Sequence, residues 1–293
     1  MPSLSFDPFA SIYDATRGYP DDIAQQVARA IDSAASATSK TTYLEVGIGT
    51  GRIAFPLASL GRTYTGVDIS EKMVAQLEEK LRNTAWRETS QPWGALQDED
   101  VAFAPIVRRF EEAAKQATMR LVMADITKLP FANASFDVVI AVHVFHLVDG
   151  WQEAVQEVRR VLRSGGVLLH CHDEWSISDV QKIGEEWRRI VRELGGKASR
   201  PGASSERDVT ALLQTWGLQT ETECVLTWEQ ATTPRLVLED IIHRRYSHVW
   251  VVPENIFAVA IQRLEQWVND YYGEGIDTVR KIEQRFMISR TRM

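Results

Sequence analysis

Glycines alternate with other residues in one short stretch, Glu45-Val-Gly47-Ile-Gly49-Thr-Gly51. An apolar run at 43–46, typical of a short buried strand, leads into this stretch, and a helical pattern follows it. Glycines at such a turn let the backbone approach a ligand closely and expose the first amides of the helix. Asp68 ends the next predicted strand, 21 residues after Gly47. A carboxylate there can accept both hydroxyl groups of a ribose.

A dinucleotide is one alternative ligand for this turn. Its fingerprint is G-x-G-x-x-G, whose third glycine would fall at Arg52 when counted from Gly47, or at Ala54 when counted from Gly49. The carboxylate of Glu45 would also repel a pyrophosphate, whereas it suits a ligand that carries a cationic ammonium group. A glycine turn without any ligand is the other alternative.

The elements around the turn predict the fold. Short apolar strands, expected at 43–46, 63–67, 119–123, 136–142 and 167–171, alternate with helical patterns. The strands lack strict polar alternation, which indicates a Rossmann-like, doubly wound, mostly parallel α/β sheet with helices on both faces. In such sheets the ligand lies outside the carboxyl ends of the strands.

Two further regions flank this core. Residues 84–118 interrupt the pattern and are predicted to be an insertion, with a loop at 86–100 and a helix at 101–117. Residues 173–293 are expected to complete the sheet and to carry a helical substrate cap, with helices at 175–194, 206–216, 234–245 and 254–272 and strands at 218–228 and 285–290. The core and an N-terminal flap would then occupy residues 1–172.

Five segments in this order resemble class I S-adenosylmethionine-dependent methyltransferases, and in particular the subgroup of ubiquinone- and menaquinone-biosynthesis enzymes. The resemblance covers about 40–172 and rests on 45–51, Asp68, 123–131, 136–142 and 157–167. It implies a sheet of seven strands whose last strand is antiparallel, a position that 285–290 would fill.

The resemblance also implies a site for S-adenosylmethionine. Its residues would be Glu45, Gly47, Gly49, Gly51, Asp68, Ile69, Asp125 and Ile126. Asp125 would hold the adenine amino group, and the backbone amide of Ile126 would meet the ring. Arg17, in a lead-in segment that resembles the same subgroup, could pair with the cofactor's carboxylate, or it is a surface arginine. Met73 could pack on the adenine, or it is a core methionine.

Two histidines follow the fourth predicted strand, in His143-Val-Phe-His146. Methyl transfer mainly requires that the two reactants be positioned, and a base is needed only when the acceptor loses a proton. His143 and His146 are therefore the candidate catalytic residues, as base or substrate anchor; the alternative is that they cap a helix or bond a backbone carbonyl. The Asn/Asp-Pro-Pro-Tyr/Phe motif of enzymes that methylate nucleic-acid amino groups is absent here.

Two other clusters have both a functional and a structural interpretation. His170 and His172 would share one face of a strand, as metal ligands do, but no second ligand cluster accompanies them and no metal is predicted. The stretch Arg244-Arg245-Tyr-Ser-His248-Val-Trp250 could bind an anionic or flat substrate, or it could be a solvated helix face.

Composition limits the classes of partner. The chain has 293 residues, and its 33 Lys+Arg against 40 Asp+Glu give a formal net charge of −7. This acidic balance argues against a nucleic-acid binder. The chain has two cysteines and lacks an apolar run of about 20 residues or a signal-peptide pattern, so a cytoplasmic protein without membrane contact is expected.

The sequence as a whole predicts a methyltransferase that acts on a small molecule with S-adenosylmethionine as cofactor. The alternative is a non-catalytic protein of the same fold that binds the cofactor or a partner. The acceptor atom (O, N, S or C) and the oligomeric state stay open.

Overall fold

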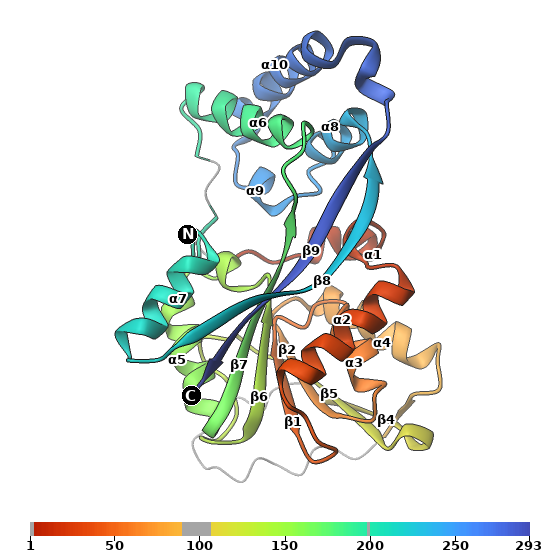
Figure 1. Ribbon diagram of the computed structural model, residues 1–293, viewed down its shortest axis with the longest axis vertical. Coiled ribbons are helices and arrows are strands. Elements are labelled where there is room, and N and C mark those ends of the chain that lie inside the picture. The colour runs from red at the N-terminus through yellow and green to blue at the C-terminus, as the bar shows by residue number, and fades with distance from the viewer. Residues whose placement is uncertain (1–2, 90–106, 198–199) are drawn as a thin grey trace. The chain divides into compact units, whose positions relative to one another are not determined.

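The computed structural model describes residues 3–89, 107–197 and 200–293. Within them one sheet of nine strands has the order β3-β4-β5-β2-β1-β6-β7-β9-β8 (Figure 1). The strands are β1 Thr42–Val46, β2 Thr63–Asp68, β3 Arg87–Glu88, β4 Val107–Glu112, β5 Ala117–Met123, β6 Phe136–Val142, β7 Leu162–Trp175, β8 Thr220–Thr232 and β9 Arg280–Arg292.

Ten α-helices and four short 3₁₀ helices lie in the described residues. They are η1 Asp7–Phe9, α1 Ala10–Arg17, α2 Asp21–Ala34, α3 Ala54–Ala58, α4 Glu71–Arg82, η2 Ala113–Lys115, η3 Phe145–Leu147, α5 Trp151–Val161, α6 Gln181–Glu193, α7 Glu206–Thr215, α8 Pro234–Ile242, α9 Ser247–Trp250, α10 Glu254–Tyr272 and η4 Gly273–Asp277. Ser70 caps the start of α4, since its hydroxyl accepts the Met73 amide (3.3 Å). A search of these residues for a helix long and apolar enough to cross a membrane finds none.

The middle of the sheet is parallel. β5, β2, β1, β6 and β7 are neighbours in that order and pair in parallel. Strand order reverses between β1 and β6, because the chain continues from β1 to β2 on one side and returns to β6 on the other. This is the arrangement of a Rossmann-like, doubly wound sheet, and the predicted fold class is confirmed. The sheet has nine strands in the described residues where seven were expected, because the segment predicted as an insertion adds β3 and β4.

The last strand is antiparallel to its two neighbours. Gly165 of β7 lies opposite Met293, whose carbonyl accepts its amide (2.8 Å), whereas Ser176 lies opposite Glu283 (2.8 Å). On the other side the hydroxyls of Thr220 and Thr291 are 2.8 Å apart, and those of Thr222 and Ser289 are 2.9 Å apart. The predicted closing strand therefore exists, but it begins at residue 280 rather than 285.

The prediction of a helix at 101–117 is wrong over Val107–Glu112, which forms β4; residues 90–106 lie outside the described part of the chain. β4 pairs antiparallel with β5, and Phe110 lies fully buried opposite Met119. Pairing with a distant strand and burial of an aromatic ring outweigh a local helical pattern. The helix expected from 175 begins later, at Gln181, because β7 continues to Trp175.

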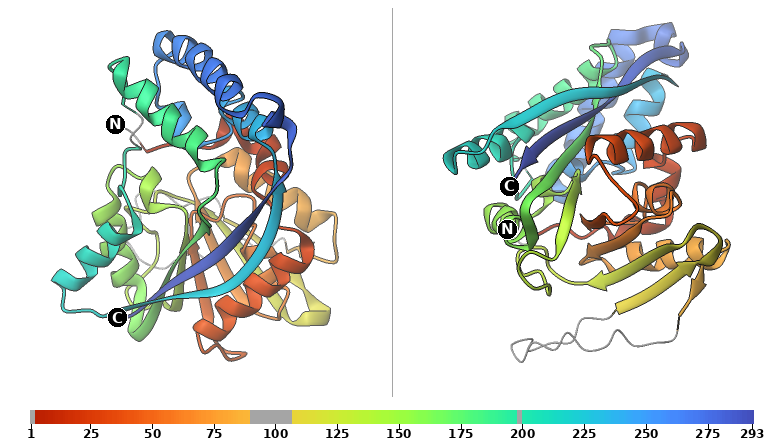
Figure 2. Two further views of the ribbon diagram at one scale, coloured as in Figure 1. Left: turned by 45° about the horizontal axis from the view of Figure 1, so that its top comes forward. Right: turned by 60° about the horizontal axis from the view of Figure 1, so that its bottom comes forward.

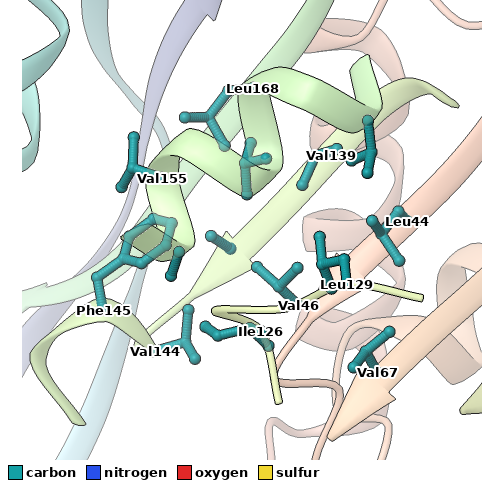
Figure 3. Close-up of a cluster of buried hydrophobic side chains, with 14 of the residues drawn as sticks. Leu44, Val46, Val67, Ile126, Leu129, Val139, Val144, Phe145, Val155 and Leu168 are labelled. Atoms are coloured by element: carbon teal, nitrogen blue, oxygen red, sulfur yellow. The ribbon is translucent and has the colours of Figure 1, made fainter. Parts of the chain in front are cut away.

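The chain divides into two compact units. The first comprises 1–172, 201–226 and 286–293, and the second comprises 173–200 and 227–285. In the first unit α5 and α7 cover one face of the sheet, where Val155 and Val158 pack with buried strand residues such as Leu44, Val139 and Leu168 (Figure 3). Residues that alternate with these along the strands, such as Tyr43, point to the opposite face, where the Tyr43 hydroxyl reaches Asp32 of α2 (2.9 Å).

The second unit has its own core. Helices α6, α8 and α10 contribute most of its buried side chains, among them Ile183, Trp187, Ile241 and Leu264. α6 and α10 lie side by side, as green and blue helices in Figure 2. Trp187 is fully buried in this cluster and its ring meets Phe257 edge-on at 5.7 Å between centroids.

One glycine of β2 is required by a close approach. A Cβ at Gly66 would lie 1.9 Å from Cδ1 of Ile48, in the turn after β1. We expect Gly66→Ala to lower the free energy of unfolding by roughly 2 kcal/mol or more, because an overpacked core must shift its backbone. The control is Gly184→Ala within α6, where the nearest atom to a Cβ is a side-chain nitrogen at 3.9 Å. That substitution should raise stability by up to about 1 kcal/mol. Equal effects in denaturant titrations would contradict the close approach.

Candidate functional site

The turn after β1 lies tightly against the end of β2. The Val67 carbonyl accepts two amides of this turn, from Gly47 (2.8 Å) and Ile48 (3.0 Å). Gly47, Gly49 and Gly51 have φ of +77°, +56° and +76°, a region that side-chain-bearing residues rarely adopt. A Cβ at Gly47 would also lie 2.6 Å from a methyl of Val144. The alternating glycines are therefore required by both conformation and space.

The carboxyl group of Asp68, at the end of β2, stabilises this turn through hydrogen bonds. Its Oδ2 accepts the Gly49 amide and its Oδ1 accepts the Ser70 amide, both at 2.8 Å. Burial raises the pKa of Asp68, and these amides oppose the increase. The Ile69 amide also acts on this carboxylate, and each carboxylate oxygen can accept more than one hydrogen bond, so the fixed carboxylate can still accept from a ligand.

Glu45 is a buried acid within β1, with 2% of its surface exposed. Its Oε2 accepts the hydroxyl of Tyr64 (2.8 Å). Burial raises the pKa of Glu45 to about 8, although the Tyr64 bond and the positive charge of Arg52 lower it; the negative charge of Asp68 adds to the increase. An incoming cation would complete this environment, which fits the ammonium group of an amino-acid moiety.

The end of β5 lies beside Asp68, since the Ala124 amide donates to the Asp68 carbonyl (3.1 Å). Asp125 follows with an exposed carboxylate, whose Oδ1 accepts the amide and hydroxyl of Thr127 (both 2.9 Å). Ile126 is buried. The strand order thus brings Asp125 to the same edge as Asp68 and Glu45.

Ile69 and Met73 differ in exposure. Ile69 is 53% exposed, unusually high for a large apolar side chain next to a buried strand. Met73 is 3% exposed, and its methyl would lie 3.2 Å from a Cβ at Gly49. Met73 therefore packs under the glycine turn, and Ile69 presents an apolar surface beside Asp68.

The N-terminal helix α1 contacts the same turn. The Thr50 hydroxyl donates to Asp14 (2.6 Å), and Lys80 of α4 forms an ion pair with the same carboxylate (2.5 Å). The Arg52 guanidinium donates to the backbone carbonyl of Arg17 (3.1 Å) and lies over the ring of Tyr19 (4.4 Å). The backbone of Arg17 thus lies next to the glycine turn.

His143 and His146 lie just beyond β6. The His143 amide donates to the carbonyl of Cys171 in β7 (3.3 Å), and the two histidine rings are 6.3 Å apart, nearly edge to face. His143 has a φ of +51°, which costs energy in a residue other than glycine. The structure therefore brings both histidines to the carboxyl edge of the sheet, one strand beyond Glu45.

His170 and His172 lie on the neighbouring strand and are both buried. Burial lowers the pKa of His170 to about 4, with Glu206 opposing and the positive charges of His172 and His143 reinforcing the decrease. Among the residues described, three or more His, Cys, Asp or Glu side chains do not come together as a metal site would require.

The basic stretch at 244–250 lies in the second unit, and its two arginines have acidic partners. Arg244 pairs with Glu254 and lies over Phe257 (3.8 Å), while Arg245 bonds Asp240 (2.7 Å). Intramolecular carboxylates therefore neutralise both charges, which favours a structural role for this stretch.

Two features of the site were not found from the sequence. Tyr64 contacts Glu45 because the two lie on one face of adjacent strands, a relation that needs the strand register. Asp14 contacts the glycine turn through Thr50. The only sequence signal for Tyr64 is that an aromatic residue with a hydroxyl group stands inside a strand that is predicted to be buried.

Comparisons with known proteins agree with this geometry. Residues 44–168 match the family model described as a methyltransferase domain. The chain is 22% identical over 173 residues to the sterol 4-C-methyltransferase of Caenorhabditis elegans, covering 59% of this chain and 43% of that protein. It is 29% identical over 143 residues to the phosphatidylethanolamine N-methyltransferase of Cereibacter sphaeroides, covering 47% and 56%. The matched part spans about half the length of these relatives.

A solved structure has the same fold. The YcgJ protein of Bacillus subtilis superposes with a TM-score of 0.55 and 16% identity, over 91% of this chain and 97% of that one. Residues 44–168 therefore match a methyltransferase domain, and the sheet around them has the fold of this solved structure. Both findings agree with the family predicted from the sequence.

The burial of Glu45 has a measurable consequence for stability. A carboxyl whose pKa is raised on folding stabilises the folded chain below its unfolded pKa, and this contribution is lost as the pH rises through the folded value. We expect Glu45→Gln, which keeps an acceptor for Tyr64, to melt at a higher temperature than the wild type at pH 8. The difference should shrink toward pH 5, and it corresponds to a few kcal/mol in total.

Thermal melts by circular dichroism between pH 5 and pH 8 measure this difference. The control for the loss of one carboxyl is Glu71→Gln, at an exposed position in the first turn of α4. A Glu45→Gln difference that does not change with pH would show that the carboxyl is ionised in the folded chain.

Proposed function

We propose that this chain transfers the methyl group of S-adenosylmethionine to a small-molecule acceptor. One observation carries the proposal: within a methyltransferase domain, Glu45, Asp68 and Asp125 come from three adjacent strands, β1, β2 and β5, and the glycine turn lies between the first two. The relatives' names, which specify a sterol and a phospholipid headgroup, support a small acceptor. The net charge of −7 weighs against a polyanionic one.

In this proposal each of the three acids binds a different part of the cofactor. Glu45 takes the ammonium group, Asp68 takes the two ribose hydroxyls, and Asp125 takes the adenine amino group. The amide of Ile126 meets the ring, which Ile69 contacts through its exposed apolar side chain, while Met73 supports the glycine turn from beneath. Gly47, Gly49 and Gly51 allow the close approach, and the guanidinium of Arg17 pairs with the carboxylate.

When bound, the cofactor would supply an electrophilic methyl group: an electron pair of the acceptor would bond the methyl carbon while the carbon–sulfur bond breaks and its electrons stay on sulfur. The chain's part is to align the acceptor and exclude water. His143 accepts the acceptor's proton where one is lost, and His146 anchors the acceptor nearby. This role of His143 requires a neutral imidazole.

The test of this function is methyl transfer by the purified chain. Incubation with methyl-labelled S-adenosylmethionine and a fractionated metabolite extract should place the label in a low-mass fraction. Label in protein or RNA would overturn the small-molecule acceptor. Calorimetric titration with NAD in place of S-adenosylmethionine should show no binding, and the opposite result would overturn the cofactor assignment.

The carboxylate of Asp68 should dominate cofactor affinity. We expect Asp68→Ala to weaken S-adenosylmethionine binding by roughly 100-fold or more, since it removes two hydrogen bonds to a charged group, each worth about 1.5–3 kcal/mol. The measurement is isothermal calorimetry on folded protein. Asp277→Asn, which changes an exposed acid in the second unit, should bind like the wild type. Equal affinity in Asp68→Ala and wild type would rule out the ribose role.

Replacement of His143 should separate chemistry from binding. Asparagine tolerates a positive φ but cannot act as a base at neutral pH, so His143→Asn keeps the local backbone. We expect a loss of turnover by a factor of 10²–10⁴ at unchanged cofactor affinity, once the acceptor is identified. His243→Asn, at an exposed position after α8, is the control. Full turnover in His143→Asn would remove the base from the mechanism.

A further inference from the structure

Tyr64 is buried beside the acid that the proposed function assigns to the cofactor's ammonium group. Tyr64 is fully buried, Glu45 is 2% exposed, and the tyrosine hydroxyl donates to Oε2 of Glu45 at 2.8 Å. The parallel register pairs Glu45 with Gly66 and Tyr43 with Tyr64. Tyr64 therefore lies on the same face as Glu45, one side-chain position nearer the amino end of its strand.

The ring of Tyr64 is held on its other side. It stacks on Tyr43, with centroids 5.8 Å apart and an interplanar angle of 21°. The Tyr43 hydroxyl donates to Asp32 (2.9 Å), whose two carboxylate oxygens also accept the guanidinium of Arg62 (2.8 and 2.7 Å). A sequence of contacts from α2 through β1 to β2 thus fixes the position of the Tyr64 hydroxyl.

The charges that face Glu45 leave its ionised form incompletely stabilised. Tyr64 from β2 and Arg52 from the glycine turn favour the carboxylate, whereas burial and Asp68 oppose it. Burial and the neighbouring Glu45 raise the pKa of Tyr64, and Tyr43 on β1 and Cys171 on β7 add to this increase. The net result is a pKa of about 8 for Glu45, so most molecules carry a proton there at pH 7.

We propose that Tyr64 is a positioning residue that presents the Glu45 carboxyl to the cofactor, and that cofactor binding expels the proton of this carboxyl into solvent. The inference rests on the proposed function. The O–H bond of the Glu45 carboxyl breaks, its electron pair stays on the oxygen, and the resulting carboxylate pairs with the ammonium group. Tyr64 remains the donor to Oε2 before and after, so the carboxylate forms with its orientation already set.

The first test counts protons in the wild-type chain. S-adenosylmethionine is titrated by calorimetry at pH 6.5 in phosphate and in imidazole, two buffers whose ionisation enthalpies differ. We expect the enthalpies to differ by an amount equal to nearly one proton released per cofactor bound. 5′-Methylthioadenosine, which lacks the amino-acid part, should release none, and Glu45→Gln should release none with either ligand.

Binding of S-adenosylmethionine with the same enthalpy in both buffers would overturn this inference while leaving the proposed function intact. Absence of any S-adenosylmethionine binding would instead overturn the proposed function. The two failures are therefore distinguishable from the same titration.

The second test concerns Tyr64 itself. Tyr64→Phe removes the donor and keeps the ring, so the carboxylate loses a stabilising bond. We expect S-adenosylmethionine to bind roughly tenfold more weakly at pH 6.5, whereas 5′-methylthioadenosine binds as before, a selectivity that a general structural defect would not produce. Tyr272→Phe, which loses a hydroxyl bond to the Asp179 carbonyl in the second unit (2.7 Å), is the matched control. Equal weakening of both ligands in Tyr64→Phe would assign the tyrosine a structural role only.

Discussion

Two backbone amides of the glycine turn donate to one carbonyl, that of Val67, and the geometry of the candidate site depends on this pair of bonds. They extend the β1–β2 ladder beyond the last residue of β1, so the turn follows β2 instead of leaving it. The next residue along, Asp68, then accepts the Gly49 amide. The absence of a side chain at Gly66 admits Ile48. The Asp68–Gly49 bond and the approach of Ile48 to Gly66 both require that the turn already lies on β2, which the two bonds to Val67 ensure.

The N-terminal segment is built into the same edge of the first unit. Asp7 accepts the Ser70 hydroxyl (2.6 Å) and the Lys72 amide (3.1 Å) at the start of α4, and the Ser70 bond and these neighbours lower the pKa of Asp7 although burial opposes them. The Leu4 amide donates to the carbonyl of Leu147 beyond β6 (2.9 Å). Residues before α2 therefore form hydrogen bonds with the loops that follow β1, β2 and β6, and these bonds help to hold the three loops in place.

Short-range sequence patterns were sufficient to predict most of the fold and the positions of the acidic residues in the site. Buried parallel strands are short apolar runs, and their ends are marked by glycine or an acid, so Glu45, Asp68 and Asp125 could be assigned to strand ends. The strand β4 could not be predicted, because its apolar side chain Phe110 is buried by a partner strand and not by its own neighbours. The contact of Tyr64 with Glu45 was equally inaccessible, since it depends on the register between two strands. Composition gives no information about register.

A buried carboxyl without a full complement of donors is costly, and an apolar residue of similar size at position 45 would give a more stable sheet. The surroundings of Glu45 reduce this cost without removing it: one hydroxyl from Tyr64 and the charge of Arg52 oppose the burial. Under the proposed function, the ammonium group of the cofactor supplies the positive charge that the buried carboxylate of Glu45 still lacks. The cost of burying the carboxylate is then relieved when a cation binds, which strengthens the binding of a cationic ligand. A neutral ligand of the same shape would not relieve this cost. The same arrangement explains why a tyrosine serves better than a lysine beside Glu45, because a lysine would neutralise the acid in advance and remove its preference for a cationic ligand.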